Sequence, residues 1–179
     1  TDIIVSTVKI GTNTRHFYET HQPGIEQEIT NSSVNSLEKL TEYIAKGVQT
    51  PLWDGVGKLI ETLIFVSDYN KRDVSFLVMI INDGDENSSR EWNAQGLKEK
   101  IQELQATDRW TFTFRVPKGH KDKLVRRLGI PEGNVLEWEQ SERGMNESPI
   151  ATRHALNAYF KSAAVGVTHS TSFYTVLTD

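Results

Sequence analysis

The chain has 179 residues, with 24 acidic and 20 basic side chains and a net charge of −4. This length suits one domain with a complete core, and the negative charge argues against general nucleic-acid binding. The chain has no cysteine, which excludes disulfides, thiolate zinc sites and cysteine nucleophiles and is typical of a reducing compartment. We therefore expect a cytoplasmic protein. No apolar run reaches the roughly 20 residues of a membrane span, so we expect no membrane partner.

The first 47 residues predict mainly β-structure followed by one short helix. Residues 2–10 are rich in Ile and Val and predict a strand, and residues 15–20 are expected to fold back as its antiparallel partner. A polar loop around a short strand at 25–29 is expected next. Ser36 can then cap a short helix that ends at Gly47.

After residue 47 the pattern alternates between helices and strands. Helices are expected at 51–63, 92–106, 121–128 and 148–164, and strands at 73–82, 110–116 and 135–138. The segment at 73–82 is apolar without alternation, which is typical of a strand buried on both faces of a parallel sheet. The pattern therefore predicts an α/β fold with a mostly parallel sheet and helices on both faces.

Polar residues gather where a ligand of such a sheet would bind, beyond the carboxyl ends of the strands. Asp83, Asp85 and Glu86 follow the buried strand directly, and Asn87, Ser88 and Ser89 come next. Their oxygen atoms suit Mg²⁺, Mn²⁺ or Ca²⁺, but the same residues also suit a loop that caps the helix at 92. Both interpretations stay open. An EF-hand is excluded, because serine and alanine stand where its glycine and last glutamate belong.

The helix beginning at Thr50 is the second polar feature. Thr50 suits an N-cap and Pro51 suits the first helical position, which is the simpler interpretation. A threonine hydroxyl at this edge can also bind a hard cation. Asp54, one turn further along, could then accept a hydrogen bond from a water bound to that cation.

Other patterns fail to define a site. The Gly55-x-Gly57-Lys58 pattern lies within a helix and lacks the spacing of a dinucleotide or phosphate loop. The five histidines show no paired metal-ligand spacing. The basic residues at 118–127 are interpreted mainly as a solvated helix face, so nucleic acid is not expected as a partner.

Two segments resemble the von Willebrand factor A (vWA) family. Residues 47–56 resemble its G-x-T-P-L-x-D-A helix start, and residues 77–87 resemble its hydrophobic strand followed by T-D-G-x-x-N. The segments at 110–116, 128–131 and 133–135 are similar to vWA proteins of tailed bacteriophages and bacteria. The resemblance implies a Rossmann-like vWA fold over residues 1–166, with one antiparallel edge strand, and a Ser/Thr-rich tail at 167–179.

The resemblance also implies a metal-ion-dependent adhesion site. Thr50 and Asp83 match two metal ligands of the family, and Asp54, Asp85 and Asn87 would lie around the rim. The family's Asp-x-Ser-x-Ser motif does not occur in the chain. Because residues 2–10 and 15–20 match the family's second and third strands, we expect the first strand and helix to lie upstream of Thr1. Binding of Mg²⁺, or of Mn²⁺ or Ca²⁺, is conditional on that motif.

The expected function is a protein–protein interaction module in which an acidic residue of the partner completes the coordination of the cation. One alternative is a metal-dependent nucleotide-sugar transferase using Asp83-x-Asp85. The other is a structural or assembly protein that uses the vWA scaffold without metal. A protein partner is expected in the first and third cases, and we expect no enzyme activity.

Overall fold

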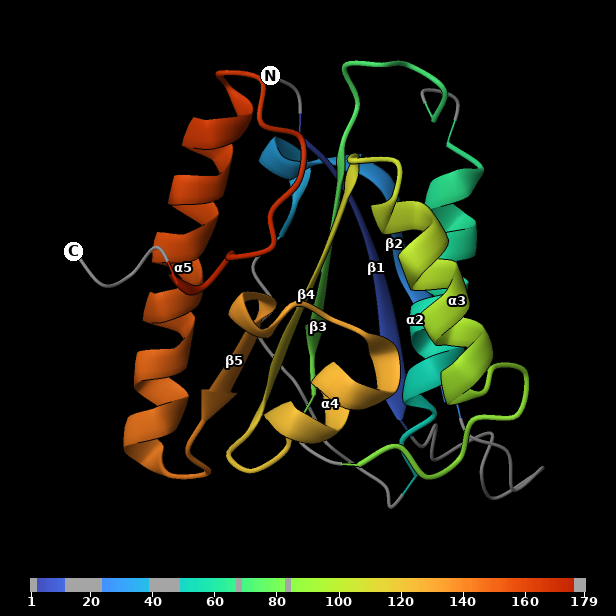
Figure 1. Cartoon of the computed structure of the whole chain (residues 1–179), viewed down its shortest axis with the longest axis vertical. Coiled ribbons are helices and arrows are strands. Elements are labelled where there is room, and N and C mark those ends of the chain that lie inside the picture. Colours follow the sequence, from blue (N-terminus) through green and yellow to red (C-terminus); the bar gives the residue numbers. More distant parts are fainter. Residues whose placement is uncertain (1–2, 12–23, 39–48, 67–68, 83–84, 176–179) are drawn as a thin grey trace. The chain divides into compact units, whose positions relative to one another are not determined.

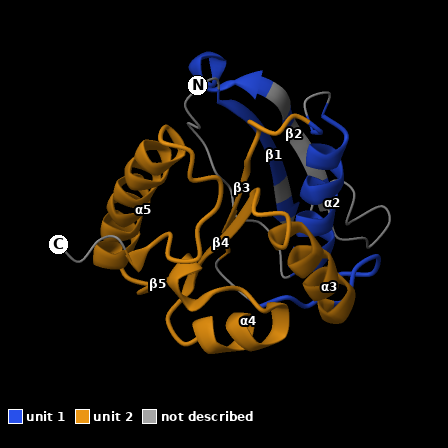
Figure 2. Ribbon diagram, turned by 45° about the horizontal axis from the view of Figure 1, so that its top comes forward, with its two compact units in different colours: residues 1–70, 85–93 blue, residues 71–84, 94–179 orange. Residues whose placement is uncertain are grey.

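The computed structural model describes residues 3–11, 24–38, 49–66, 69–82 and 85–175. They fall into two compact units, shown in two colours in Figure 2. Unit 1 consists of Thr1–Asn70 and Asp85–Asn93, and unit 2 consists of Lys71–Gly84 and Ala94–Asp179. The loop that follows the first strand of unit 2 therefore belongs to unit 1.

In its described residues, unit 1 has a two-stranded antiparallel sheet and one long helix. Strand β1 (Ile4–Gly11) pairs with β2 (Gly24–Ser33), which leads into a short 3-10 helix, η1 (Val34–Ser36). Helix α2 (Leu52–Ile64) packs closely on β1, since a Cβ atom at Gly55 would overlap the side chain of Ile10. Strand β2 contains the short strand expected at residues 25–29. Residues 15–20, and residues 39–47 of the helix expected after Ser36, lie outside the described residues.

Unit 2 contains the parallel sheet. Strands β3 (Phe76–Ile81), β4 (Trp110–Pro117) and β5 (Val135–Trp138) are parallel and lie in the order β3-β4-β5. The other elements are α3 (Ala94–Gln105), α4 (Lys121–Leu128), η2 (Glu132–Asn134) and α5 (Glu142–Ala163). The expected Rossmann-like α/β fold is confirmed, although its antiparallel strands form a separate sheet. No helix in the described part of the chain is long and apolar enough to cross a membrane.

Helices cover both faces of the parallel sheet, with α5 on one side and α3 and α4 on the other (Figure 1). The α5 face has an aromatic core in which Tyr159 and Phe173 pack with Leu77 of β3 and Leu136 of β5. The central strand β4 alternates along its length. Its large apolar residues, Trp110, Phe112 and Phe114, are at most 1% exposed. Thr111 and Thr113 lie opposite Leu77 and Met79 of β3, which pack against the core on the α5 side. The polar residues Thr111, Thr113 and Arg115 of β4 therefore point toward α5.

Three helices begin at other residues than the sequence predicts, and one of them is α3, which begins at Ala94 rather than at Trp92. Helix α5 begins at Glu142 rather than near Ser148, with Ser141 Oγ accepting a hydrogen bond from the backbone N–H of Gly144 at 3.1 Å. Pro149 suits a first helical position, yet it lies inside this helix. Helix α2 begins at Leu52 with Pro51 as its N-cap, so Thr50 does not cap it.

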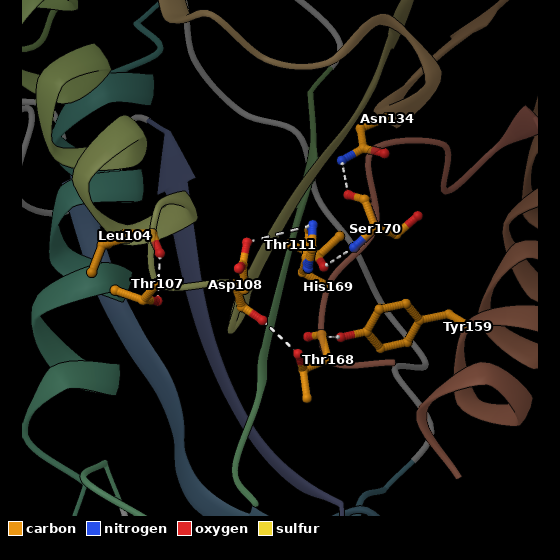
Figure 3. A network of polar contacts seen from close by, with 9 residues as sticks. All are labelled: Leu104, Thr107, Asp108, Thr111, Asn134, Tyr159, Thr168, His169 and Ser170. Carbon is orange, nitrogen blue, oxygen red and sulfur yellow. Dashed lines mark hydrogen bonds and ion pairs between the residues drawn. The ribbon is translucent and has the colours of Figure 1, made fainter. Parts of the chain in front are cut away.

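The segment after α5 is bound to unit 2 by polar contacts (Figure 3). Thr168 Oγ1 donates to the carbonyl oxygen of Asp108, and the backbone N–H of Ser170 donates to Thr111 Oγ1 at 2.9 Å. The buried Asn134 donates to the carbonyl oxygen of Ser170 at 2.7 Å and accepts from the N–H of Phe173 at 2.9 Å. Phe173 is 2% exposed. Through these contacts the described part of the tail packs as part of unit 2.

Candidate functional site

Four of the five predicted site residues lie in the described part of unit 1. Thr50 precedes α2, Asp54 lies in its first turn, and Asp85 and Asn87 lie in the segment Asp85–Asn93, which we call the capping loop. Asp83 lies outside the described residues. The last described residue before it is the buried Asn82, which directly follows β3. The capping loop and the start of α2 form the candidate site.

Glu86 supplies the cap that α2 cannot make for itself. Pro51, at the N-cap position, makes no side-chain cap hydrogen bond, so the first N–H groups of the helix need other acceptors. Glu86 Oε2 accepts from the N–H of Trp53 at 3.0 Å, and Ser89 Oγ accepts from the N–H of Asp54 at 3.2 Å. A carboxylate at this end of a helix is also favoured by the helix dipole. The capping loop thus stabilises the start of α2.

Asp54 makes the reciprocal contact, from the helix to the loop. Its carboxylate accepts the backbone N–H groups of Arg90 at 2.7 Å, Glu91 at 3.0 Å and Trp92 at 2.7 Å. Asp54 is 5% exposed, and a buried carboxylate is stable only when such donors compensate it. Its side chain therefore fixes the path of the loop.

Three further contacts complete the attachment of the capping loop. Thr50 and Asn87 bond twice, with the N–H of Thr50 donating to Asn87 Oδ1 at 2.7 Å and the N–H of Asn87 donating to the Thr50 carbonyl at 3.2 Å. The ring of Trp92 lies against Gly57 so closely that a Cβ atom there would overlap it. This contact explains one glycine of the Gly55-x-Gly57 pattern, and the contact with β1 explains the other.

Hydrogen bonding controls the charge of Glu86. Burial alone would raise its pKa, but hydrogen bonds from Ser89 Oγ and from the N–H groups of Ser89, Trp53 and Ser88 lower the pKa below its ordinary value of 4.5. The hydroxyl of Ser89 is 2.6 Å from Glu86 Oε2, and its N–H is 2.7 Å from Oε1. The group is therefore a firmly ionised carboxylate at neutral pH and is poorly suited to proton transfer.

The described residues of this site do not by themselves make a cation site. The carboxylate of Asp54 and the amide oxygen of Asn87 are occupied by backbone donors, and Asp85 is exposed. In the described segments no group of three or more Asp, Glu or His side chains is arranged to hold a metal ion. Binding of a cation by Thr50 and Asp83 stays a prediction from the sequence.

The basic residues at 118–127 include two that form ion pairs at the surface of unit 2. Lys118 pairs with Glu139 at 3.3 Å and Lys121 pairs with Glu132 at 3.2 Å. Glu137 Oε1 also accepts the N–H groups of Gly119 and Lys121 at the start of α4. Acidic residues of unit 2 thus pair with two of these basic residues, and the interpretation of the segment as a solvated face stays a prediction.

Sequence reasoning missed the main role of Glu86 and Ser89. A capping role for the acidic and Ser-rich segment was one expected interpretation, but for the helix that follows the segment. The structure shows that the segment caps α2, where Glu86 accepts from Trp53, a residue 33 positions earlier in the chain. One available signal was Pro51 at the helix start, because a proline cap leaves the next N–H groups in need of a distant acceptor.

Comparisons of this chain with protein-family models, with curated proteins and with solved structures found no match.

Proposed function

We propose that this protein is a protein-binding module whose recognition surface is the capping loop. The observation that carries the proposal is the complete attachment of this loop to α2 by Asp54 and Glu86. A loop held in one conformation before binding loses little conformational entropy when a partner docks, which favours recognition.

The exposed side chains of the capping loop are suited to contact a partner. Five exposed residues carry charged or amide groups: Asp85, Asn87, Arg90, Glu91 and Asn93. Mixed charges at the rim of an interface select a partner and orient it. The buried carboxylates of Asp54 and Glu86, in contrast, are occupied by hydrogen bonds, so they serve architecture rather than acid–base catalysis. The resemblance to vWA domains, which recognise proteins through this edge, points the same way.

Among the functions expected from the sequence, this proposal corresponds to the alternative that works without a metal ion. The described contacts of the loop need no cation to hold its backbone, because protein groups supply the donors for both carboxylates. A cation bound by Thr50 and Asp83 would add to this surface and is the second form of the same proposal, supported by the vWA-like motifs alone.

Site-specific crosslinking in the cells that produce the protein tests the proposal. A photo-crosslinking amino acid at Arg90 in the loop is expected to give a discrete protein adduct, and the same amino acid at the exposed Glu61 of α2 is the matched control. The adduct should weaken when Asp54→Ala frees the loop and should persist in EDTA. Equal adducts at both positions, or none at Arg90, would contradict the proposal. An adduct at Arg90 that requires Mg²⁺ would support the second form.

A further inference from the structure

Unit 2 contains a cavity that the proposed function does not use. Its volume is about 250 Å³, it is partly open to solvent, and it lies between the last turns of α5 and the tail segment that follows this helix. Helix α5 contributes Ala158, Tyr159 and Ser162 to its lining, and the tail contributes Val167 and residues 169–173. All of these residues belong to unit 2, so the cavity is independent of the capping loop.

Hydrogen bonds hold the tail wall of this cavity in place. The backbone N–H of Ser170 donates to Thr111 Oγ1 at 2.9 Å (Figure 3). The N–H of Ser172 donates to Ser170 Oγ at 3.2 Å, and the N–H of Phe173 donates to Asn134 Oδ1 at 2.9 Å. A wall that is ordered before binding loses little conformational entropy when a ligand binds.

The polar groups of the lining are mostly hydroxyls. They belong to five residues: Tyr159, Ser162, Ser170, Thr171 and Ser172. In the described part of the chain, the hydroxyls of Ser162, Thr171 and Ser172 make no hydrogen bond to another residue, so they can bind a ligand in place of water. Each hydroxyl can donate one hydrogen bond and accept two. The lining therefore matches a ligand whose own polar groups both donate and accept.

The charges around the cavity favour a neutral ligand. His169 Nε2 lies 3.8 Å from Asp108 Oδ1, so a positive charge on the imidazole would be compensated by that carboxylate (Figure 3). No lysine, arginine, aspartate or glutamate is among the described residues that line the cavity. An anionic ligand would therefore find no basic side chain of its own, and a cationic ligand would find no carboxylate. Transferring an uncompensated charge from water to such a site costs free energy.

The size and the apolar part of the lining restrict the ligand further. A volume of about 250 Å³ lies just below the roughly 300–1,000 Å³ of pockets for drug-sized ligands, and it suits a ligand of monosaccharide size. The side chains of Ala158 and Val167 offer apolar contact for the C–H groups of such a ligand. Tyr159 and Phe173 are at most 7% exposed and belong to the aromatic core behind the cavity.

We propose that this cavity binds a neutral sugar of monosaccharide size, either free or as one residue of a glycan. The hydroxyls of a sugar both donate and accept, as do those of Ser162, Thr171 and Ser172. Its C–H groups match Ala158 and Val167, and its lack of charge matches a lining without an uncompensated ion.

Titration with glucose, galactose and mannose at millimolar concentrations, followed by NMR of the backbone amides, tests this inference. At least one of the three sugars is expected to shift the amide signals of residues 169–172. The amides of α4, on the other face of the sheet, serve as the internal control (Figure 1). The methyl glycoside of the bound sugar distinguishes the two sources, because a site for a glycan residue accepts it and a site for a free sugar rejects it.

The charge of the ligand is tested with glucose 6-phosphate, which should bind no more tightly than glucose. Tighter binding of the phosphate ester would overturn the assignment of a neutral ligand. The inference also fails if none of the three sugars shifts the signals of residues 169–172.

Matched variants make the test specific. Ala158→Leu fills the cavity and should abolish the shifts, and leucine is a good helix former. Ala151→Leu places the same change two turns earlier on α5, at another half-buried position that does not line the cavity, and should bind as the wild type does. Ser162→Ala removes one hydroxyl and should weaken binding about fivefold. Unchanged α4 signals show that each variant is folded. Wild-type affinity in Ala158→Leu would place the sugar elsewhere and overturn the inference.

Discussion

Asp54 Oδ1 accepts the backbone N–H of Trp92 at 2.7 Å, across 38 positions of sequence. The same oxygen accepts from Glu91, and Asp54 Oδ2 accepts from Arg90. A single buried side chain at the start of α2 thus determines the conformation of three consecutive loop residues.

Replacing Asp54 with alanine should lower the free energy of unfolding by about 2–4 kcal/mol, because three buried N–H groups lose a charged acceptor. Urea denaturation measures this loss, and hydrogen exchange at Arg90, Glu91 and Trp92 should become faster in the variant. The control is Glu61→Ala at an exposed position of the same helix, for which a change within about 0.5 kcal/mol is expected. Unchanged exchange at the three amides would show that Asp54 does not hold the loop.

Glu86 should make stability depend on pH. Its pKa is lower in the folded state than in the unfolded chain, so the unfolded state binds more protons in that range and stability rises with pH. The contribution of Glu86 should be complete above about pH 5 and should be lost as the pH falls through the folded pKa. The wild type should therefore lose its advantage over Glu86→Gln on acidification.

The measurement is the free energy of unfolding of both proteins over the acidic range, with Glu61→Gln as the baseline for loss of an exposed carboxylate. A wild-type advantage that grows as the pH falls would have the wrong sign and would exclude the lowered pKa.

The sequence was sufficient to predict most elements of unit 2. Helix α4 was predicted with the observed bounds, since Gly129 adopts the left-handed conformation that ends a helix, and β5 likewise. The start of α5 was not predictable in the same way. Ser148 and Pro149 have the local pattern of a helix start, and only the tertiary structure extends the helix back to Glu142.

The candidate site was predictable in its residues but not in their roles. Asp85 was recognised because it follows the apolar segment at 73–82, and Thr50 because it stands with Pro51 at the start of a predicted helix. The contacts of the site run between residues more than 30 positions apart, and local periodicity carries no information about such pairs.

Gly57→Ala should destabilise unit 1, although alanine is the better helix former by about 1 kcal/mol. The added methyl group would overlap the ring of Trp92, and overpacking of this kind costs about 1–3 kcal/mol. A double-mutant cycle with Trp92→Ala measures the coupling. In the Trp92→Ala background the clash is gone, so Gly57→Ala should become neutral or stabilising. Additive effects of the two changes would contradict the close contact.

Asn134→Ala should release the C-terminal tail from unit 2. The Asn134 side chain is fully buried, donates to the carbonyl oxygens of Phe112 and Ser170, and accepts from the N–H of Phe173. Its loss leaves these groups unpaired and should cost about 2–4 kcal/mol of unfolding free energy. Limited proteolysis should then cleave the segment at 167–172 faster, because Phe173 no longer anchors it.

The Asn134→Asp variant distinguishes the hydrogen bonds that the Asn134 side chain donates from the one that it accepts. The aspartate keeps an acceptor for the N–H of Phe173 but faces two carbonyl oxygens without a donor, so it should destabilise the tail at neutral pH at least as much as alanine does. Ser172→Ala, at an exposed tail position, is the control and should leave proteolysis unchanged. Equal cleavage rates in Asn134→Ala and the wild type would mean that the apolar contacts of Phe173 alone hold the tail.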